Sequence, residues 1–309
     1  MISAVNLNPC IDRTVFLPSL IVGGHNVASR VQNDVSGKAI NVNVVLSNLG
    51  VETKAVGFEF CRSGTPVKAF LDSLSIPSDM VSVDAELRVN TKLFDSGAME
   101  MTEINCKGPH IGKDAVEELM RVFERNLDGT DIIVIDGSVP PGVPIDIYKT
   151  MTELAHAKGI KVVLDATGDL LAKGLEARPD IVKPNVGELE LLIGRKLSGI
   201  GEWVAACNDL TAQGVGAVCL SLGGDGALYV TGDKAWYSKG LDIKVRSFQG
   251  AGDSLVAGIC LGIMAGYGPE MLLRSAMAAA HGSLLRDGTL LCLREDYEKF
   301  FEIMPVEMI

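Results

Sequence analysis

Asp131-Ile-Ile-Val-Ile-Asp136 is a run of β-branched residues that opens an alternation of short apolar segments with helical ones. A helical pattern follows near residues 145–158, and further apolar runs lie at 161–165, 181–183 and 217–222. Strands that alternate with helices at this spacing predict a parallel sheet covered by helices on both faces. We therefore expect an α/β fold from this part of the chain.

The N-terminal hundred residues have a different pattern, in which extended and partly polar segments follow the apolar run 2–7. These segments predict a small antiparallel sheet and lie at residues 14–17, 27–35, 91–94 and 98–102. One helix is expected between them at Ile40–Leu49, and Gly50 would end it as a C-cap glycine does.

The domain organisation follows from these two patterns. Residues 10–35 and 86–104 are expected to form a small β-sheet lid. The remaining segments, 1–9, 36–85 and 105–309, are expected to form one large α/β core. The sequence contains no internal repeat and no low-complexity tract that would divide this core further.

Composition describes a globular chain: its 309 residues are 47% hydrophobic and 22% charged, with a mean hydropathy of +0.26. Such a chain buries a large core without disulfides or metals, and a disordered protein is excluded. The 28 Lys and Arg against 39 Asp and Glu give a net charge of -11. Because this charge repels polyanions such as DNA, nucleic acid is not an expected partner.

Cysteine usage and apolar patterning indicate the cellular setting. The chain has 7 cysteines, an odd number, with no C-x-x-C pair, which indicates reduced thiols and a cytoplasmic protein. The N-terminus lacks the basic and apolar regions of a signal peptide. The most apolar later segment, Leu255–Ala265, is interrupted by Gly258 and Gly262 and is shorter than the ~20 residues that span a bilayer. No contact with a membrane is expected.

Gly250-Ala-Gly-Asp-Ser254 precedes an apolar helical pattern that continues to Met264. The two glycines allow a tight turn, so that several N–H groups and the positive end of the helix dipole point at one place and form an anion cradle. Asp253 would lie beside the anion, an unfavourable place for a carboxylate unless it accepts a proton from an attacking hydroxyl. Simple N-capping by Asp253 or Ser254 is the alternative.

Two other glycine motifs are excluded by single positions. A dinucleotide fingerprint that starts at Gly250 needs glycine where the chain has Leu255, and a P-loop that ends at Lys38 needs glycine where the chain has Gln32. The second segment predicts instead a turn that delivers Lys38 and Asn41 to the start of a helix. Their side chains then face either a binding site or solvent.

Lys183-Pro-Asn185 and Glu188 follow a predicted strand, at the edge where open parallel sheets bind ligands. Pro184 restricts Lys183 to extended geometry. The i, i+3 spacing of Asn185 and Glu188 allows both side chains to face one metal-bound water. The same pair also fits a capping box at the start of a helix, and the two interpretations are compatible.

The remaining polar residues give weaker signals. Ser221-Leu-Gly-Gly-Asp-Gly226 follows another buried strand, where its glycines either admit a nucleotide or form a tight hairpin. Asp12, Arg88, Asn90 and Lys92 supply polar groups on the predicted lid. The 4 histidines lack metal-ligand spacing and no G-x-S-x-G is present, so neither a zinc site nor a hydrolase triad is expected.

Taken in chain order, these motifs resemble those of the ribokinase-like (PfkB-type) sugar kinases, and the likeness spans nearly the whole chain. It rests on Asn8-Pro-Cys-Ile-Asp12, Gly37-Lys-Ala-Ile-Asn41, Arg88-Val-Asn90, Thr102-Glu-Ile-Asn105, Gly137-Ser-Val-Pro-Pro-Gly142, Lys183-Pro-Asn185 with Glu188, Ser221-Leu-Gly-Gly-Asp-Gly226 and Gly250-Ala-Gly-Asp253. The N-P-x-x-D start and the T-E-x-N segment are similar to the branch that holds 1-phosphofructokinase and tagatose-6-phosphate kinase.

The resemblance implies ATP-dependent, Mg²⁺-assisted phosphorylation of a ketohexose phosphate. Fructose 1-phosphate is the leading acceptor, and tagatose 6-phosphate is the alternative. The family likeness also implies a three-layer sandwich with a mostly parallel central sheet, and a lid that pairs with a second subunit to form a homodimer.

The same resemblance implies roles for the acceptor half of the site. Asp253 would be the general base, and the backbone at Gly250, Ala251 and Gly252 would hold the transferring phosphoryl group. The acceptor would be bound by two groups of residues: Asp12, Gly37 and Asn41 for sugar hydroxyls, and Lys38 with Arg88 for the resident phosphate. Asn90 and Ser138 complete the substrate-binding set.

For the nucleotide half, the resemblance implies that Lys183 and Asn185 face the phosphates of ATP. Glu188, with Asn185, would hold magnesium through water. The nucleotide itself would be bound by Ser221, Gly223 and Gly226, with Gly252 at the phosphates.

Several positions depart from the family pattern. Ser36 and Ala39 stand where glycines are usual beside the sugar, and Val27 stands where a basic residue is usual near the sugar phosphate. Residues 59–61 and 248–249 are larger than those that usually precede or follow the substrate loops. A catalytically weak sensor of sugar phosphates or nucleotides, and a kinase for nucleosides or unphosphorylated sugars, are therefore kept as alternatives.

Overall fold

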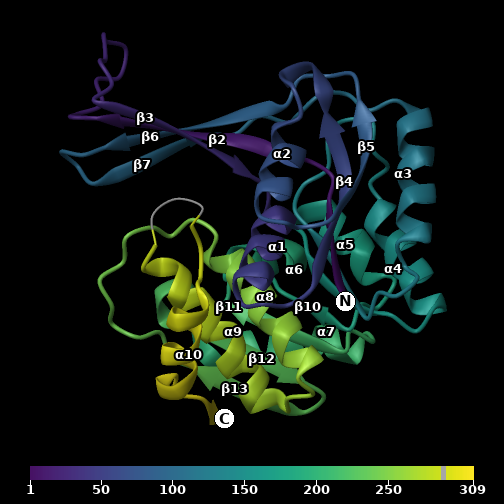
Figure 1. Ribbon diagram of the computed structural model, residues 1–309. Helices are drawn as coiled ribbons and strands as arrows, with labels where there is room; N and C mark the ends of the chain where they lie inside the picture. The colour runs from purple at the N-terminus through teal and green to yellow at the C-terminus, as the bar shows by residue number, and fades with distance from the viewer. Residues whose placement is uncertain (287–289) are drawn as a thin grey trace.

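The computed structural model describes residues 1–286 and 290–309, which contain one sheet of ten strands and one of four (Figure 1). The larger sheet is made of β1 (Ile2–Asn6), β4 (Thr53–Phe60), β5 (Ser78–Val83), β8 (Ile132–Asp136), β9 (Lys161–Asp165), β10 (Ile181–Val182), β11 (Ala217–Ser221), β12 (Ala227–Thr231), β13 (Lys234–Ser238) and β14 (Glu307–Met308). Its order is β14-β13-β12-β11-β10-β9-β8-β1-β4-β5. Neighbouring strands from β11 to β5 are parallel, and β12 to β14 add an antiparallel edge. The expected α/β class with a mostly parallel sheet is confirmed.

Helices cover both faces of this sheet. They are α1 (Lys38–Asn48), α2 (Pro66–Ser73), α3 (Lys113–Arg125), α4 (Ile147–Ala157), α5 (Gly168–Leu175), α6 (Val186–Ile193), α7 (Gly199–Ala212), α8 (Ala251–Met264), α9 (Pro269–Leu284) and α10 (Arg294–Ile303). α1, α8 and α9 pack together on one face, with α10 against α9, and α3 to α7 form the layer on the other face. The arrangement is the three-layer sandwich that the motifs predicted. None of these helices is long and apolar enough to cross a bilayer.

The smaller sheet has the order β3-β2-β6-β7 and extends from the larger one as an arm (Figure 1). Its strands are β2 (Cys10–Leu17), β3 (Arg30–Ser36), β6 (Arg88–Asp95) and β7 (Glu100–Ile104). β3 pairs with β2, and β7 pairs with β6, in antiparallel fashion, whereas β2 and β6 run parallel. The sheet is therefore mixed rather than fully antiparallel. Local patterns contain no information on the direction in which strands from two separate excursions meet.

α1 illustrates how well local patterns predicted the elements. It starts at Lys38 and its C-cap is Leu49, close to the expected range 40–49, and its apolar residues, such as Ile40 and Leu46, are buried. Gly50 follows with a φ of 76°, the left-handed conformation that glycine adopts without strain and that commonly ends a helix. The role predicted for this glycine is therefore confirmed.

The central strands are buried on both faces, as expected for parallel strands between two helical layers. Every residue of β1 and β8 is buried, and so are four of the five residues of β9. The last residues of these three adjacent strands are polar: Asn6, Asp136 and Asp165. Lys183 follows β10, the next strand along, and is also buried. Buried polar side chains at the carboxyl edge of a parallel sheet mark the position where such sheets bind ligands.

Gly57 on β4 leaves room for the backbone of Asn6, the last residue of β1, at this edge of the sheet. It pairs with Asn6 and has a φ of 159°, and a Cβ atom at this position would overlap the backbone carbonyl oxygen of Asn6. Gly37 has a similar function on the other side, because a Cβ there would lie 2.9 Å from the Asn6 side-chain nitrogen. The two glycines therefore hold Asn6 where it lines the cavity described below.

Replacement of Gly57 tests this packing constraint. Gly57→Ala is expected to lower the free energy of unfolding by about 3 kcal/mol or more, because a Cβ against rigid backbone forces two central strands apart. Gly201→Ala is the matched control: Gly201 lies inside α7 with open space around its Cβ position, so stability should rise by about 0.5–1 kcal/mol. Urea denaturation measures both, and equal effects would contradict the constraint.

Candidate active site

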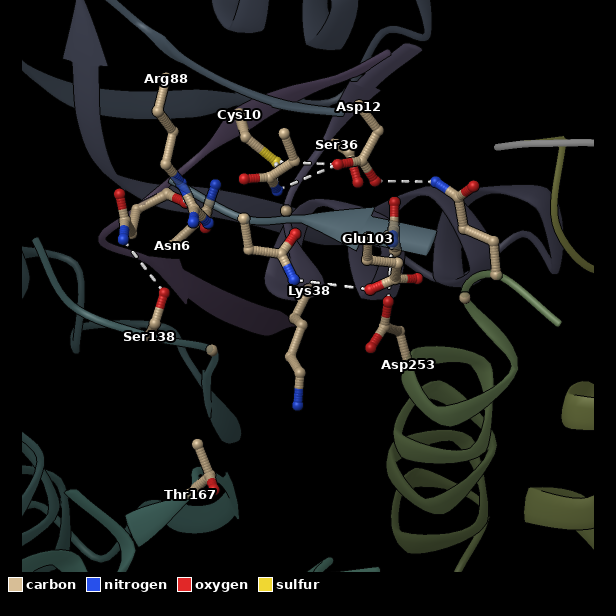
Figure 2. Close-up of a pocket in the computed structure, with 18 of the residues that line it drawn as sticks. Asn6, Cys10, Asp12, Ser36, Lys38, Arg88, Glu103, Ser138, Thr167 and Asp253 are labelled. Atoms are coloured by element: carbon tan, nitrogen blue, oxygen red, sulfur yellow. Dashed lines mark hydrogen bonds between the residues drawn. The ribbon is translucent and has the colours of Figure 1, made fainter. Parts of the chain in front are cut away.

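A cavity of about 490 Å³ lies between the carboxyl edge of the large sheet and the inner face of the small sheet (Figure 2). It brings together most of the residues predicted to bind the acceptor or to act in catalysis. Those that line it are Asp12, Gly37, Lys38, Asn41, Arg88, Asn90, Ser138, Gly250 and Asp253, and Glu188, which was predicted to hold magnesium, lines it too. Residues from six separate parts of the chain, at 12, 37–41, 88–90, 138, 188 and 250–253, therefore meet at one place.

The turn before α8 has the conformation predicted for an anion cradle. Gly250 is the N-cap of α8 with a φ of 74°, and its cap position carries no side-chain hydrogen bond. The first N–H groups of a helix have no partner within the helix, so they are available to a ligand at this end. Ser254 does not cap the helix, because its hydroxyl donates to the Gly250 carbonyl oxygen at 2.7 Å. The simple capping alternative therefore does not describe this turn.

Asp253 is buried in the first turn of α8, with 7% of its surface exposed. Its Oδ2 accepts a hydrogen bond of 2.7 Å from Nδ2 of Asn41 on α1. Burial raises the pKa of Asp253, while Lys38 and the Asn41 hydrogen bond act in the opposite direction. A carboxyl group with a raised pKa that faces a cavity is suited to accept a proton from a substrate.

Two lysines share one buried aspartate at the floor of the cavity. Asp165 Oδ1 lies 3.1 Å from Nζ of Lys38, and Asp165 Oδ2 lies 2.9 Å from Nζ of Lys183. Burial opposes ionisation of Asp165, but Lys183 and Lys38 outweigh it, so its pKa lies below the usual range. Asp165 therefore stays charged and holds both ammonium groups at the strand ends.

Lys183 also lies next to the turn before α8. A Cβ atom on Gly252 would be 3.9 Å from Nζ of Lys183, so the ammonium and the first turn of the helix face one another. Both groups attract anions. The structure thus brings together two parts of the predicted phosphate site that lie about 70 residues apart in sequence.

Asp12 projects from β2 of the small sheet into the same cavity. Its Oδ1 accepts a hydrogen bond of 3.1 Å from Asn90, and its Oδ2 accepts bonds of 3.0 Å from Lys92 and 2.9 Å from Gln249. Although burial raises the pKa of Asp12, the charge of Lys92 and the hydrogen bonds from Lys92 and Asn90 lower it below the usual value. Gln249 lies directly before the turn that starts α8, so this bond ties the small sheet to the start of that helix.

Arg88 lies at the other end of the cavity from the Lys38 ammonium, which points away from it (Figure 2). The guanidinium donates to the backbone carbonyl oxygens of Asn8, at 2.7 Å, and Cys106, at 2.7 Å. Nearby, Nδ2 of Asn8 donates to the hydroxyl of Ser138 at 3.0 Å. The resemblance assigned Lys38 and Arg88 together to the resident phosphate. The structure holds their charged groups at separate places in the cavity.

Asn185 and Glu188 form the capping box that the sequence allowed. Asn185 Oδ1 accepts from the Glu188 amide, and Glu188 Oε2 accepts from the Asn185 amide, both at 2.9 Å. This arrangement leaves Glu188 Oε1 outside the box while Glu188 lines the cavity. A carboxylate oxygen is the ligand type that Mg²⁺ prefers, so Glu188 fits a magnesium site and Asn185 fits less well.

The residues predicted to bind the nucleotide lie beyond the cavity. Ser221 ends β11 and forms an isolated bridge with Asn185. Gly223 and Gly226 lie in the turn between β11 and β12, which pair as an antiparallel hairpin. Gly226 has a φ of 107°, which favours glycine. The hairpin is present, and the strand end that carries it lies beside Asn185.

Sequence reasoning missed several residues of the site. Asp136 and Asp165 are the last residues of predicted strands, and with Asp253 they offer three carboxylate oxygens within 4.8 Å of one another. Their signal was a charged residue that ends a strand otherwise made of apolar residues. Gln249 and Glu103 also line the cavity. Contacts of this kind depend on strand order, which local patterns do not give.

A helix N-terminus aimed at a cavity that also holds a buried carboxylate and two lysines fits an enzyme that transfers phosphoryl groups. The chain matches the model of the pfkB family carbohydrate kinases over residues 5–296. It belongs to this family and is a carbohydrate kinase. The resemblance inferred from the motifs is thereby confirmed.

Individual relatives show which members of this family the chain is similar to. The 1-phosphofructokinase of Bacillus subtilis is 35% identical over 263 residues, covering 85% of this chain and 86% of the relative. That of Escherichia coli K12 is 30% identical over 279 residues, covering 90% and 89%. A solved structure described as a possible 1-phosphofructokinase from Thermotoga maritima superposes with a TM-score of 0.90 at 28% identity, over 100% of this chain and 99% of the other.

The ion pairs of Asp165 predict a stability effect. Asp165→Asn should lower the free energy of unfolding by about 3–5 kcal/mol, because the buried Lys183 ammonium and the partly exposed Lys38 ammonium lose the carboxylate that neutralises them. Asp128→Asn is the control: Asp128 pairs with Lys158 on the surface, where it is 80% exposed, and should have little effect. Thermal and urea unfolding measure both variants. A stable Asp165→Asn protein would show that the lysines do not depend on this group.

Proposed function

We propose that this protein transfers the γ-phosphoryl group of ATP to a ketohexose phosphate, with fructose 1-phosphate as the leading acceptor and fructose 1,6-bisphosphate as the product. The observation that carries the proposal is the buried Asp253 at the start of α8, in one cavity with Asp12 and Arg88 of the small sheet. The 1-phosphofructokinases of Bacillus subtilis and Escherichia coli, related over most of the chain, support the choice of acceptor. Tagatose 6-phosphate is the alternative acceptor.

Asp253 is proposed to be the general base. As the acceptor oxygen bonds to the γ-phosphorus and the bond to ADP breaks, the hydroxyl proton passes to the carboxylate. The raised pKa of Asp253, caused by burial, makes it a stronger base than an exposed aspartate. The hydrogen bond from Asn41 keeps the carboxylate in place before the proton arrives.

The small sheet is proposed to bind the acceptor. Asp12, with Asn90 beside it, would hold sugar hydroxyls, and both side chains are already oriented by their mutual hydrogen bond. Gly37 and Ser138 line the same space. Arg88 would hold the resident phosphate, because the hydrogen bonds that fix its guanidinium go to carbonyl oxygens and leave its positive charge available to an anion.

Lys38 is proposed to act on the transferring phosphoryl group rather than on the resident phosphate. Its ammonium lies at the strand ends beside Asp165, on the same side as Lys183 and the turn at 250–252. A cation there faces the oxygens on which negative charge is concentrated during transfer, and one such group is typically worth ~3 kcal/mol of the barrier. The backbone of Gly250, Ala251 and Gly252 would supply further donors.

ATP is proposed to lie with its phosphates at Lys183 and its nucleoside toward Ser221, Gly223 and Gly226. Glu188 fits Mg²⁺ through its oxygen outside the capping box, with water between them and Asn185 at the edge. When bound, the ion neutralises charge on the β- and γ-phosphates. The protein's own part is to hold the phosphates in line with the acceptor and to exclude water.

An acceptor panel tests the function. Purified protein with ATP and Mg²⁺ would be assayed for ADP release with fructose 1-phosphate, tagatose 6-phosphate, fructose 6-phosphate, fructose and a nucleoside. We expect the highest kcat/KM with fructose 1-phosphate. Binding of a sugar phosphate without turnover of any acceptor would identify a sensor, and preference for a nucleoside or an unphosphorylated sugar would contradict the proposed phosphate site.

In the same assay Asp253→Asn should lower kcat by at least ~100-fold, because the hydroxyl proton loses its acceptor, while calorimetry still detects ATP binding. Asp114→Asn is the matched control, since Asp114 is an exposed carboxylate in the first turn of α3. Its activity should equal that of the unmodified protein. Unchanged turnover by Asp253→Asn would show that Asp253 is not the general base.

We also propose that the protein is a cytoplasmic homodimer joined through the small sheet. Val15 pairs with Val31 and with Leu93, so these three lie on one face, the face opposite to Asp12. Val31 on β3 is 50% exposed, and Ile104 on β7, at the other edge of the sheet, is 53% exposed. A sheet with one apolar face turned outward is stabilised when a second copy covers it. The seven unpaired cysteines are consistent with a reducing compartment.

Light scattering after size exclusion tests the dimer. The mass is expected to be twice the 32.8 kDa of one chain, and Val31→Glu should shift it to one chain because a charge is placed in the apolar contact. Ile145→Glu is the control, since Ile145 is 46% exposed on the core and should leave the dimer intact. A monomeric unmodified protein would overturn the proposal.

A further inference from the structure

Asp136 is a buried carboxylate for which the proposed mechanism has no role. It ends β8, its side chain is 0% exposed, and neither of its oxygens has a hydrogen-bond partner. A buried charge without compensation costs several kcal/mol or more, and each such group in a folded protein requires an explanation. The hydroxyl of Tyr148 beneath it donates to the carbonyl oxygen of Gly137, not to Asp136.

The charged groups around Asp136 lie on α1, β9 and α8 and directly after β10. Lys38 Nζ on α1 lies 3.8 Å from its Oδ1, and oxygens of Asp165 on β9 and Asp253 on α8 lie within 4.8 Å. Lys183 is the other cation nearby and is paired with Asp165. Burial and then Asp165 raise the pKa of Asp136, and Lys38 opposes them. The charge on Asp136 therefore depends on the ammonium of Lys38.

We propose that Asp136 is a positioning residue for the reaction, which holds the Lys38 ammonium at the floor of the cavity, facing the phosphoryl group. The inference rests on the proposed function of Lys38. Lys38 is anchored by a hydrogen bond to Asp165 at 3.1 Å, whereas Asp136 at 3.8 Å is too far to accept one. Asp136 thus attracts the ammonium without using any of its N–H groups.

Because only Asp165 accepts a hydrogen bond from Lys38, the other N–H groups of the ammonium remain for the substrate. An ammonium has three N–H groups and Asp165 takes one, so two remain for the oxygens of an incoming phosphoryl group. If both aspartates formed hydrogen bonds, the lysine would be held in place with one donor left. The Asp136 charge, which attracts the Lys38 ammonium without a hydrogen bond, restrains the position of Nζ. The ammonium can still rotate about the Cε–Nζ bond.

Without Asp136, the same lysine would have a weaker hold. Asp165 is shared with Lys183, and two ammonium groups around one carboxylate repel each other. Lys38 opposes the protonation of Asp136, and in its ionised form Asp136 supplies the second negative charge that allows both cations to stay at this edge. A small displacement of a charge that stabilises the transition state lowers kcat strongly, whereas the affinity for either substrate changes less.

A double-mutant cycle tests the inference, with wild type, Asp136→Asn, Lys38→Met and the double variant compared on the acceptor that the wild type uses. Asp136→Asn should lower kcat by about 10-fold to 100-fold, with both KM values within about 3-fold. In the Lys38→Met background the same substitution should have little further effect, because residues that act through each other are not additive. The thermal unfolding temperature of the single variant Asp136→Asn should be equal to that of the wild type or higher, since a buried charge is removed.

The contrary results are equally specific. An unchanged kcat in Asp136→Asn would overturn the positioning role. So would an equally large loss of kcat when the same substitution is made in the Lys38→Met background. If the asparagine disturbs folding, Asp136→Ser takes its place in the cycle. Asp296→Asn is the control for a buried carboxylate outside the cavity; it loses its pairing with Arg286 and should lose stability without a change in kcat. Failure of the wild type on every acceptor would instead reject the proposed function, so the two failures are distinguishable.

Discussion

Local neutralisation of buried charge is the constraint on which the functional edge of this protein depends. Three carboxylates and two ammonium groups meet where β8, β9 and β10 end and where α1 and α8 begin. None of these groups is stable there alone, because the surrounding medium solvates ions poorly. Asp165 lies at the centre of the arrangement. Its two oxygens contact two different lysines, so the positions of α1 and of the segment after β10 are fixed relative to one carboxylate.

The small sheet is attached to this charged floor by polar contacts as well as by the chain. Gln249, directly before the turn that starts α8, donates to Asp12 on β2 at 2.9 Å. Asp12 is further held by Asn90 and Lys92. A sugar that binds Asp12 must therefore share or replace existing hydrogen bonds, and the cost of that exchange is lowest for hydroxyls placed where the present donors are. With Asp12 as the proposed ligand of the sugar, this requirement would select the shape of the acceptor before any chemistry takes place.

The sequence predicted those features that depend on neighbours along the chain. The bounds of α1, the strand at 161–165 and the capping box of Asn185 with Glu188 all follow from local patterns. The parallel pairing of β2 with β6 and the convergence of Asp136, Asp165 and Asp253 do not. Both are consequences of strand order, since β8 and β9 become neighbours only when helices have carried the chain back across the sheet. A charged residue at the end of a strand looks the same in sequence whether it faces solvent or a second carboxylate.

Three carboxylate oxygens within 4.8 Å have the composition of a divalent metal site, yet a cation already lies beside them. Lys38 is 3.1 Å from Asp165 and 3.8 Å from Asp136, and burial of the lysine is outweighed by Asp165 and then Asp136, which raise its pKa. An ammonium that stays protonated supplies the positive charge here, and its remaining N–H groups would donate to the oxygens of the phosphoryl group. The proposed Mg²⁺ site at Glu188 uses a different carboxylate, outside this cluster. Two cations of different kind, held by separate carboxylates, would separate the task of holding ATP from the task of stabilising the negative charge that develops during transfer.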